Sequence, residues 1–251
     1  MRRLAVVALL LVGGCAGPMQ APTPLRSIEY APASAPAKCL FVLLPGRGDR
    51  AETFKERGFL AALQGRALSI DIRATDATFG YYMRGTFVER LAADVIAPAK
   101  SRGYEEIWLV GPSMGGFGSL LYSRGHAADV TGVLAIAPFL GDRKMIAEIA
   151  AAGGLKNWHA PARVEEINRD NYQGELWRWL QAATQGRENS PLIFAGFGTA
   201  DSLSGANSLL AAELPPARVF LTSGGHEWPA WRRILDNFLD SPDFATRCRK
   251  N

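Results

Sequence analysis

The stretch Ile107-Trp-Leu-Val-Gly-Pro-Ser-Met-Gly-Gly-Phe-Gly-Ser-Leu-Leu-Tyr122 decides the fold of this chain. Its apolar start, 107–110, predicts a buried strand, and the glycines after Ser113 open a predicted helix. Residues 111–115 match the pattern G-x-S-x-G at this turn from strand to helix. Glycines on both sides let the backbone bend sharply, so that the serine hydroxyl stands clear of its neighbours. The pattern predicts a nucleophilic serine; the alternative is a glycine-rich turn of an ordinary α/β protein.

Further short apolar runs surround this stretch and predict buried strands at 39–44, 67–73, 130–138, 192–197 and 218–222. Such strands, alternating with helices, are typical of a mostly parallel sheet that helices cover on both faces. We expect helices at 50–64 and 86–102, the second of them bent or ended by Pro98. Between these two helices we expect a loop that holds Phe79, Tyr81, Tyr82 and Arg84.

The segment 141–190 is long for a single crossover, and it follows the fourth core strand. It carries Trp158, His159, Trp177 and Trp179. We expect it to form a cap-like insertion of two or three helices, which lie over the carboxyl ends of the strands as a partial lid.

Length and composition predict one soluble globular domain. The chain has 251 residues, of which 48% are hydrophobic and 21% charged. It has 28 basic and 24 acidic residues, and without Arg2 and Arg3 the basic count is 26, a net charge of only +2. No cluster of Lys and Arg with interleaved aromatic residues occurs in the sequence. We therefore expect no nucleic-acid partner.

The N-terminus is typical of an exported protein. Two arginines precede the short apolar run 4–12, and small residues follow it, as in a signal peptide, here 1–14. The residues before Cys15 also resemble a bacterial lipobox, in which the cysteine is lipidated and becomes the new N-terminus. We expect a protein of the cell envelope, in the periplasm or at the outer membrane, anchored in the membrane through Cys15. The alternative is a plain signal peptide with a cysteine there by chance.

Residues 15–37 are rich in Pro and Ala and suit a semi-extended tether, within which 26–30 can add an edge strand. The folded domain is then 38–251. With Cys15 acylated, Cys39 and Cys248 remain as an even pair in an oxidising compartment, where they can form a disulfide. No C-x-x-C or His/Cys metal spacing occurs, so we expect no structural zinc.

Three predicted strands end in residues that suit nucleophilic catalysis. Ser113 follows one of them, Asp201 follows the strand at 192–197, and His226 follows the last strand. In an open parallel sheet, sites form at the carboxyl ends of the strands. The order Ser, Asp, His and the motifs Ser113-Met-Gly-Gly-Phe-Gly and His226-Glu-Trp-Pro-Ala-Trp resemble an esterase-like serine hydrolase of the α/β-hydrolase fold. The resemblance covers roughly 38–239.

The resemblance implies a role for each of these residues. Ser113 is the nucleophile, His226 the general base, and Asp201 the carboxylate that orients the imidazole. The backbone N–H groups of Met114 and Arg47 then form the oxyanion hole. Many relatives have a His-Gly pair where this chain has Pro-Gly, directly before Arg47.

Some positions have a second interpretation. Asp142 occupies a place that some members of the family use for the acid. Asp49 suits the support of a helix start better than catalysis. Arg47 and Arg84 can meet an anionic substrate group or remain solvated. Four aromatic residues can line an acyl pocket or belong to the core: Tyr81, Tyr82, Trp158 and Trp177.

The sequence thus predicts hydrolysis of a small-molecule or lipid-like carboxylic ester through an acyl-enzyme, without a metal or organic cofactor. Thioesterase, peptidase or acyltransferase chemistry on the same three residues is the nearest alternative. A catalytically silent envelope lipoprotein, which uses the fold for binding, is the alternative of another class. The oligomeric state, the acyl group and its length are not predicted.

Overall fold

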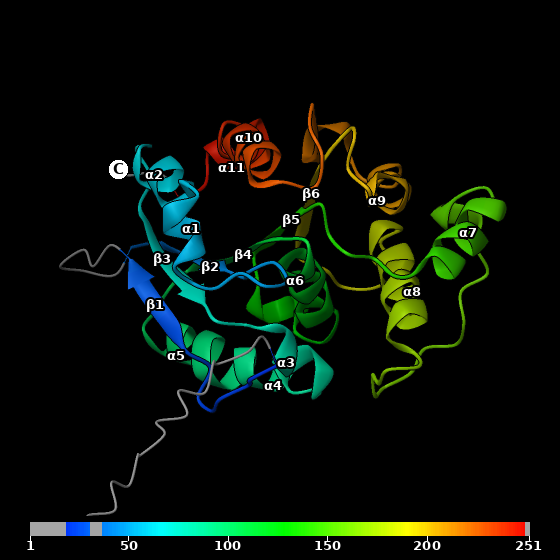
Figure 1. Ribbon diagram of the computed structural model, residues 1–251, viewed down its shortest axis with the longest axis horizontal. Coiled ribbons are helices and arrows are strands. Elements are labelled where there is room, and N and C mark those ends of the chain that lie inside the picture. The colour runs from blue at the N-terminus through cyan, green and yellow to red at the C-terminus, as the bar shows by residue number, and fades with distance from the viewer. Residues whose placement is uncertain (1–18, 31–36, 249–251) are drawn as a thin grey trace, which may run out of the picture.

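The computed structural model describes residues 19–30 and 37–248 (Figure 1). The predicted signal peptide and Cys15 lie outside the described residues. Within them, no helix has both the length and the apolar character needed to cross a bilayer.

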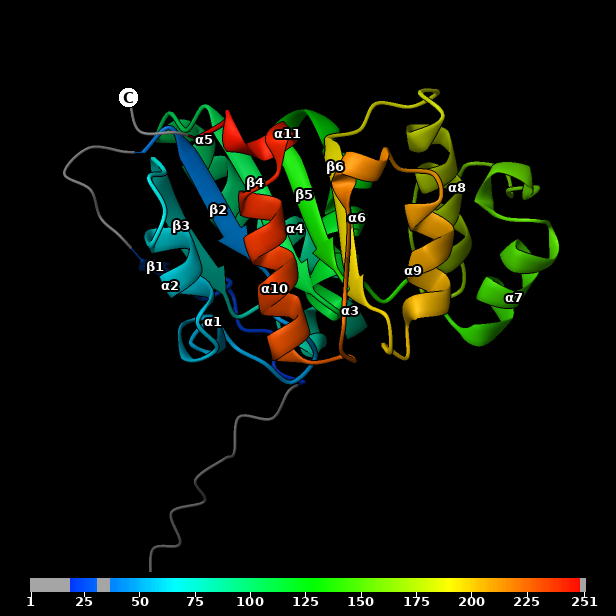
Figure 2. The same cartoon turned by 90° about the horizontal axis from the view of Figure 1, so that it is seen from above.

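A seven-stranded sheet with the order β1-β3-β2-β4-β5-β6-β7 forms the centre of the domain (Figure 2). Strand β1 pairs antiparallel with β3, and the pairs from β3 to β7 are parallel. The prediction of a mostly parallel α/β sheet is confirmed, and each strand lies within a few residues of its predicted position. The strands are β1 (Ser27–Tyr30), β2 (Cys39–Leu43), β3 (Ile70–Thr75), β4 (Glu106–Pro112), β5 (Gly132–Ile136), β6 (Leu192–Gly198) and β7 (Val219–Thr222).

Helices cover both faces of the sheet because alternate strand residues point to opposite faces. In β2, Leu40 and Val42 join one hydrophobic core, whereas Phe41 and Leu43 join the other. The first core includes residues of α4 (Phe87–Leu91), α5 (Ala97–Ser101), α6 (Met114–Gly125), α8 (Tyr172–Thr184) and α9 (Ser204–Ala211). The second includes residues of α1 (Thr53–Glu56), α2 (Phe59–Gln64), α10 (Trp228–Leu239) and α11 (Pro242–Ala245).

The helices differ locally from their prediction. The helix expected at 50–64 is interrupted at Gly58, whose φ of +79° places it in the left-handed region. The helix at 86–102 has a π-helical turn at Ala92–Ile96. It does not end at Pro98, which lies in the first turn of α5. Residues Phe79–Met83, expected as a loop, form the short helix α3.

The N-terminal segment packs on the domain, which corrects the boundary that we expected at 38. Residues 27–30 form the edge strand β1, and Leu25 is buried in the first core. The hydroxyl groups of Thr78 and Tyr81 donate to the carbonyl oxygens of Gln20 and Pro22. The folded part therefore includes 19–30, and only the remainder of the predicted tether lies outside the described residues.

The insertion 141–190 lies beside the sheet rather than over the carboxyl ends of its strands (Figure 1). Helix α8 packs against α6, and its Trp177 and Trp179 are fully buried in the first core. Helix α7 (Arg143–Ala151) packs against α9 at the outer side. The buried tryptophans explain the difference from the expected lid, because they bind α8 into the domain as part of a covering layer.

A disulfide joins Cys39, the first residue of β2, to Cys248, with 5.6 Å between the two Cα atoms. The Cys248 carbonyl oxygen also accepts a hydrogen bond from Ser69 N at 2.7 Å. Because the two cysteines are 209 positions apart, the bond closes nearly the whole folded chain into one loop.

We expect the Cys39→Ser/Cys248→Ser double variant to lose about 2–5 kcal/mol of unfolding free energy, because the open unfolded chain gains loop entropy. Urea unfolding followed by tryptophan fluorescence measures this change. We expect the ester hydrolysis predicted from the sequence to be unchanged at 25 °C, since the disulfide lies at the amino ends of the strands, away from Ser113. An unchanged urea midpoint would contradict the prediction, and Cys15→Ser is the control.

Candidate active site

Ser113 stands in a strained turn between β4 and α6. Its backbone has φ 53° and ψ −114°, a conformation that a residue with a side chain rarely adopts. A Cβ at Gly115 would overlap the carbonyl oxygen of Leu44, and one at Gly111 would come within 2.5 Å of the Gly115 carbonyl carbon. The glycines of the motif are therefore required by the close approach of backbone to backbone.

Hydrogen bonds hold this turn in place. Ser113 N donates to Ile136 O of β5 at 2.8 Å. The Ser113 carbonyl oxygen accepts from Phe117 N at 3.1 Å and from Phe139 N at 3.2 Å. The serine backbone is thus tied both to the first turn of α6 and to the loop that follows the neighbouring strand.

His226 and Asp201 meet at the carboxyl edge of the sheet. His226 Nδ1 lies 2.9 Å from Oδ2 and 3.0 Å from Oδ1 of Asp201, whose residue is only 3% exposed. The Asp201 carboxylate also accepts Leu203 N at 2.8 Å. A buried carboxylate on Nδ1 holds the proton there and leaves Nε2 as the basic nitrogen.

Backbone contacts bring these two loops together. Thr199 N donates to Thr222 O at 2.8 Å, and Ala200 N donates to Gly224 O at 3.0 Å. A Cβ at Gly198 would overlap the Gly224 carbonyl oxygen, so the approach of the loops needs glycine at this position. The loop after β6 and the loop after β7 are therefore one packed unit.

Asp142 lies elsewhere and has other partners. It is exposed and caps α7, with Oδ1 accepting Met145 N at 2.9 Å. This hydrogen bond, followed by one from Gln173, lowers the pKa of its carboxyl group. Of the two carboxylates considered from the sequence, the one in contact with His226 is Asp201.

The turn 46–49 lies beside Ser113. A Cβ at Gly46 would be 3.8 Å from Ser113 Cβ, and Asp49 N donates to Gly46 O at 3.1 Å. Arg47 is the second residue of this turn, next to Gly48 with φ +91°. Met114 is the first residue of α6, where an N–H has no intrahelical partner. Both backbone donors expected from the sequence therefore belong to segments next to the serine.

Asp49, the last residue of this turn, is half-buried. Burial raises the pKa of its carboxyl group, against the opposing effects of the Arg57 charge and a hydrogen bond with Trp228. Trp228 is the first residue of α10, the helix that follows His226. Asp49 thus links the turn at Arg47 to the helix start next to the histidine.

Aromatic residues gather next to Ser113, and sequence reasoning found only one of them, Tyr82. The Phe117 ring lies 5.8 Å from Tyr82, 6.2 Å from Phe139 and 5.7 Å from Tyr172, centroid to centroid. The Tyr82 hydroxyl donates to Met114 O at 3.4 Å. We call Tyr82, Phe117, Phe139 and Tyr172 the aromatic wall. Position 117 was recognisable, since it follows Ser113 by one helical turn.

The other three aromatic candidates belong to the core. The hydroxyl of Tyr81 donates to Pro22 O, Trp177 Nε1 donates to Leu140 O, and Trp158 Nε1 donates to the Glu148 carboxylate. All three side chains are buried, so they hold the domain together.

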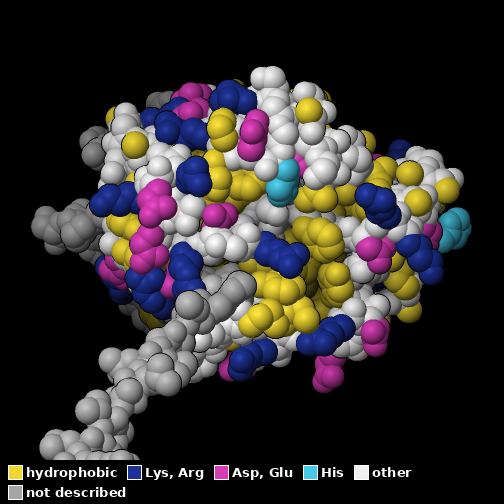
Figure 3. All heavy atoms as spheres, viewed as in Figure 1, with side chains coloured by type: hydrophobic (Ala, Val, Ile, Leu, Met, Phe, Trp, Pro, Cys, Tyr) yellow, Lys and Arg dark blue, Asp and Glu magenta, His cyan; other side chains and the backbone are white. Residues whose placement is uncertain are grey.

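Figure 3 shows the carboxyl-edge face of the molecule, on which hydrophobic side chains gather beside a histidine. Arg47 is exposed, and its guanidinium lies over the Phe79 ring at 4.9 Å from the centroid. Arg84 is exposed as well. A cation–π contact of this kind holds an arginine in a defined place at the surface.

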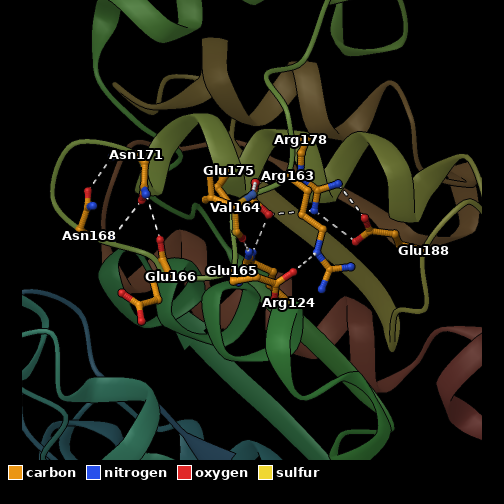
Figure 4. A network of polar contacts seen from close by, with 10 residues as sticks. All are labelled: Arg124, Arg163, Val164, Glu165, Glu166, Asn168, Asn171, Glu175, Arg178 and Glu188. Carbon is orange, nitrogen blue, oxygen red and sulfur yellow. Dashed lines mark hydrogen bonds and ion pairs between the residues drawn. The ribbon is translucent and has the colours of Figure 1, made fainter.

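A buried ionic network fastens the insertion (Figure 4). Glu175 of α8 accepts hydrogen bonds from Arg124 of α6 and from Arg178, each at 2.8 Å, and Arg178 also binds Glu188. Burial alone would raise the pKa of Glu175, but the hydrogen bonds from Arg178 and Arg124 outweigh it and lower that pKa. The network fixes α8, and hence Tyr172 at its start, relative to α6.

Two other features of the described residues do not contribute to this site. A cavity of about 390 Å³ lies between α7 and the segment 161–175, and none of the site residues lines it. The metal-ligand grouping found among the described residues combines Cys39 and Cys248 with Glu106, and both sulfur atoms are in the disulfide. The strained serine and the His–Asp pair therefore mark the site by their chemistry.

Comparison with models of known protein families gives no match for this chain, and no curated protein matches it. Solved structures do match. An S-formylglutathione hydrolase from Agrobacterium tumefaciens has a TM-score of 0.56 and 14% identity, over 89% of this chain and 90% of that one. A ferulic acid esterase has a TM-score of 0.55 and 18% identity, over 81% and 83%. The fluorophosphonate-binding serine hydrolase F of Staphylococcus aureus has a TM-score of 0.55 and 11% identity, over 86% and 97%. The fold is that of these hydrolases, the α/β-hydrolase fold.

Replacing Asp201 by Asn tests the role of the carboxylate on His226. We expect a loss of turnover of about 10⁴-fold, since the amide favours the wrong imidazole tautomer and cannot stabilise an imidazolium. Steady-state hydrolysis of a p-nitrophenyl ester measures the loss, and the urea midpoint shows that the variant is folded. Asp142→Asn is the matched control and keeps its activity. A loss in Asp142→Asn with full activity in Asp201→Asn would reverse the assignment.

Proposed function

We propose that this protein is a serine hydrolase that cleaves a carboxylic ester through an acyl-enzyme formed on Ser113. The observation that carries the proposal is the conjunction of a strained serine at the end of β4 with a His226–Asp201 pair on the same sheet edge. A strained backbone costs stability, and a buried carboxylate against an imidazole suits the orientation of that imidazole, so both features fit a catalytic role. The similar solved structures, which by name are an esterase, a serine hydrolase and an S-formylglutathione hydrolase, add support.

In the first half of the proposed reaction, Ser113 Oγ attacks the ester carbonyl carbon while His226 Nε2 takes the hydroxyl proton. The carbonyl oxygen becomes an oxyanion, which the backbone N–H groups of Met114 and Arg47 stabilise. The carbon–oxygen bond to the leaving group then breaks, and the imidazolium donates its proton to that alkoxide. An alcohol leaves, and the acyl group remains on Ser113.

In the second half, water replaces the alcohol. His226 takes a proton from the water molecule as it attacks the acyl carbon, and the same two N–H groups hold the new oxyanion. The bond to Ser113 Oγ breaks, and the imidazolium returns the proton to the serine. The products are a carboxylic acid and the free enzyme. Throughout, the Asp201 carboxylate stabilises the positive charge on the imidazole.

The aromatic wall supports a hydrophobic acyl group as the substrate. The backbone N–H groups of Phe117 and Phe139 both donate to the Ser113 carbonyl oxygen, so both residues are joined directly to the backbone of the nucleophile. Tyr172 extends the wall from α8. Rings that meet edge to face leave apolar surface for an aliphatic or aromatic acyl chain. A ferulic acid esterase, among the similar structures, is named for an aromatic acid.

We also propose that the protein is exported to the cell envelope and anchored there through Cys15, on the basis of the N-terminal sequence.

Two other functions use the same fold differently. Thioesterase, peptidase or acyltransferase chemistry would need only another leaving group or acceptor at Ser113. A binding protein without activity would retain the fold but have no use for the His226–Asp201 pair.

A fluorophosphonate probe tests the nucleophile directly. We expect the probe to label the wild-type protein covalently, and Ser113→Ala to abolish labelling because the attacking oxygen is gone. Intact mass spectrometry gives the added mass, and peptide mapping places it on Ser113. Ser119→Ala, at a serine within α6, is the matched control and keeps its labelling. If the probe does not label the wild-type protein, the proposal that it is a serine hydrolase is contradicted.

The aromatic wall predicts acyl selectivity. We expect Phe139→Ala and Tyr172→Ala to lower kcat/KM for a phenylpropanoyl ester about tenfold relative to the acetyl ester, or about 1.4 kcal/mol, because apolar contact is lost. The ratio of the two kcat/KM values measures the effect and cancels a general loss of active protein. Phe220→Ala, a half-buried aromatic on the edge strand β7, is the control and keeps the ratio. Equal losses for both esters would contradict the prediction.

A further inference from the structure

The N-terminal segment reaches the domain at the face that holds the proposed catalytic residues. A Cβ at Gly80 of α3 would come within 2.6 Å of the Gln20 carbonyl oxygen and also overlap Met19 O. Helix α3 follows β3, so it lies at the carboxyl edge of the sheet, as does Ser113 after β4. Met19, the first described residue, is therefore placed on the active-site face.

The distance from there to the proposed anchor is short. Cys15 precedes Met19 by four residues, which span at most about 14 Å when fully extended. A chain lipidated at Cys15 thus holds Met19 within about 14 Å of the lipidated residue, which is about twice the thickness of one headgroup layer. Because the segment from Met19 to Leu25 is packed on the domain, it adds no further length to the tether.

The surface around α3 has the chemistry of a membrane-contacting face. Met19 is 52% exposed, and Phe79, Tyr82 and Met83 are half-buried. Exposed arginines surround them: Arg84 ends α3, Arg47 lies over Phe79, and Arg169 donates to Met83 O at 2.7 Å. Aromatic rings suit the boundary between water and hydrocarbon, and guanidinium groups bind lipid phosphates. We call these seven residues the α3 surface.

We propose that the α3 surface rests on the lipid bilayer in which Cys15 is anchored, and that the enzyme takes its acyl ester from that bilayer. The inference rests on the proposed hydrolase and its proposed anchor. It adds an orientation, because an anchor alone fixes a distance and leaves the domain free to rotate. Tyr82 belongs both to this surface and to the aromatic wall, and Arg47 belongs both to this surface and to the oxyanion turn. An ester partitioned in the same leaflet as the anchor then reaches Ser113 without crossing water.

A double substitution separates membrane contact from catalysis. Met19→Asp/Arg84→Glu adds negative charge to the α3 surface at two residues that take no part in the proposed reaction. The matched control is Leu221→Asp/Arg187→Glu, with the same kinds of change at an exposed leucine on β7 and at an exposed arginine after α8. Each lipidated full-length chain is reconstituted on vesicles of phosphatidylcholine and phosphatidylglycerol at about 4:1.

Two esters are then compared, soluble p-nitrophenyl acetate and a p-nitrophenyl ester of a long acyl chain embedded in the vesicles. The proposal expects the α3 variant to lose at least tenfold in rate on the embedded ester, with less than a twofold change on the soluble one. The control double variant keeps both rates. Equal rates of the α3 variant and the wild type on the embedded ester would overturn the proposal.

The further outcomes separate this proposal from the function on which it rests. If Cys15→Ser remains in membrane fractions as the wild type does, the anchor is wrong and the orientation falls with it, while turnover of the soluble ester leaves the hydrolase intact. If neither ester is cleaved, the hydrolase itself fails. A photoreactive phosphatidylcholine in the same vesicles should label peptides around 19 and 79–84. Labelling only of peptides from β7 and α8 would overturn the proposal, as would a dimer that buries the α3 surface.

Discussion

The strained backbone at Ser113 is the constraint on which the rest of the site depends. A non-glycine residue with φ 53° costs about 1–3 kcal/mol, and it persists only where the surroundings over-determine it. Here strands β4 and β5 both contribute, since Ser113 N binds Ile136 O and Phe139 N binds Ser113 O. Ala137, which directly follows β5, has a φ of 42°, and its N–H binds Gly196 O of β6. Hydrogen bonds therefore tie the two strained residues to one another's strands and to β6.

This continuity explains why Asp201 and His226 lie where they do. The backbone of β6 that accepts Ala137 N leads directly into the loop of Asp201, and that loop is bound to the loop of His226 through Ala200 N and Gly224 O. A shift in any one strand end would move the others. For catalysis such rigidity matters, because a misplacement of about 1 Å can cost 10²-fold in rate.

Much of this arrangement could be predicted from the sequence, and the rest depends on contacts that it does not record. Apolar runs of four to nine residues placed the strands, and the sheet edge then grouped Ser113, Asp201 and His226 as the topology requires. The position of the insertion could not be predicted correctly, because a tryptophan such as Trp177 is equally compatible with a lid and with a core helix until its neighbours are known. The N-terminal segment was misjudged for a related reason. Its Pro-rich composition is typical of a tether, whereas hydrogen bonds from Thr78 and Tyr81 to its carbonyl groups bind it to the domain.

The placement of the insertion changes how water can be excluded from Ser113. A helical lid would have covered the serine during each half of the proposed reaction, but α8 is held at the side by Trp177 and by Arg124 on Glu175. Dehydration must then come from what meets the open face, namely the acyl group on the aromatic wall and any surface against which that face rests. A bilayer close to α3 would supply such a surface, and it would also present the ester. With the proposed anchor at Cys15, the spacing of four residues to Met19 and the open carboxyl edge would together favour acyl esters delivered from the membrane side.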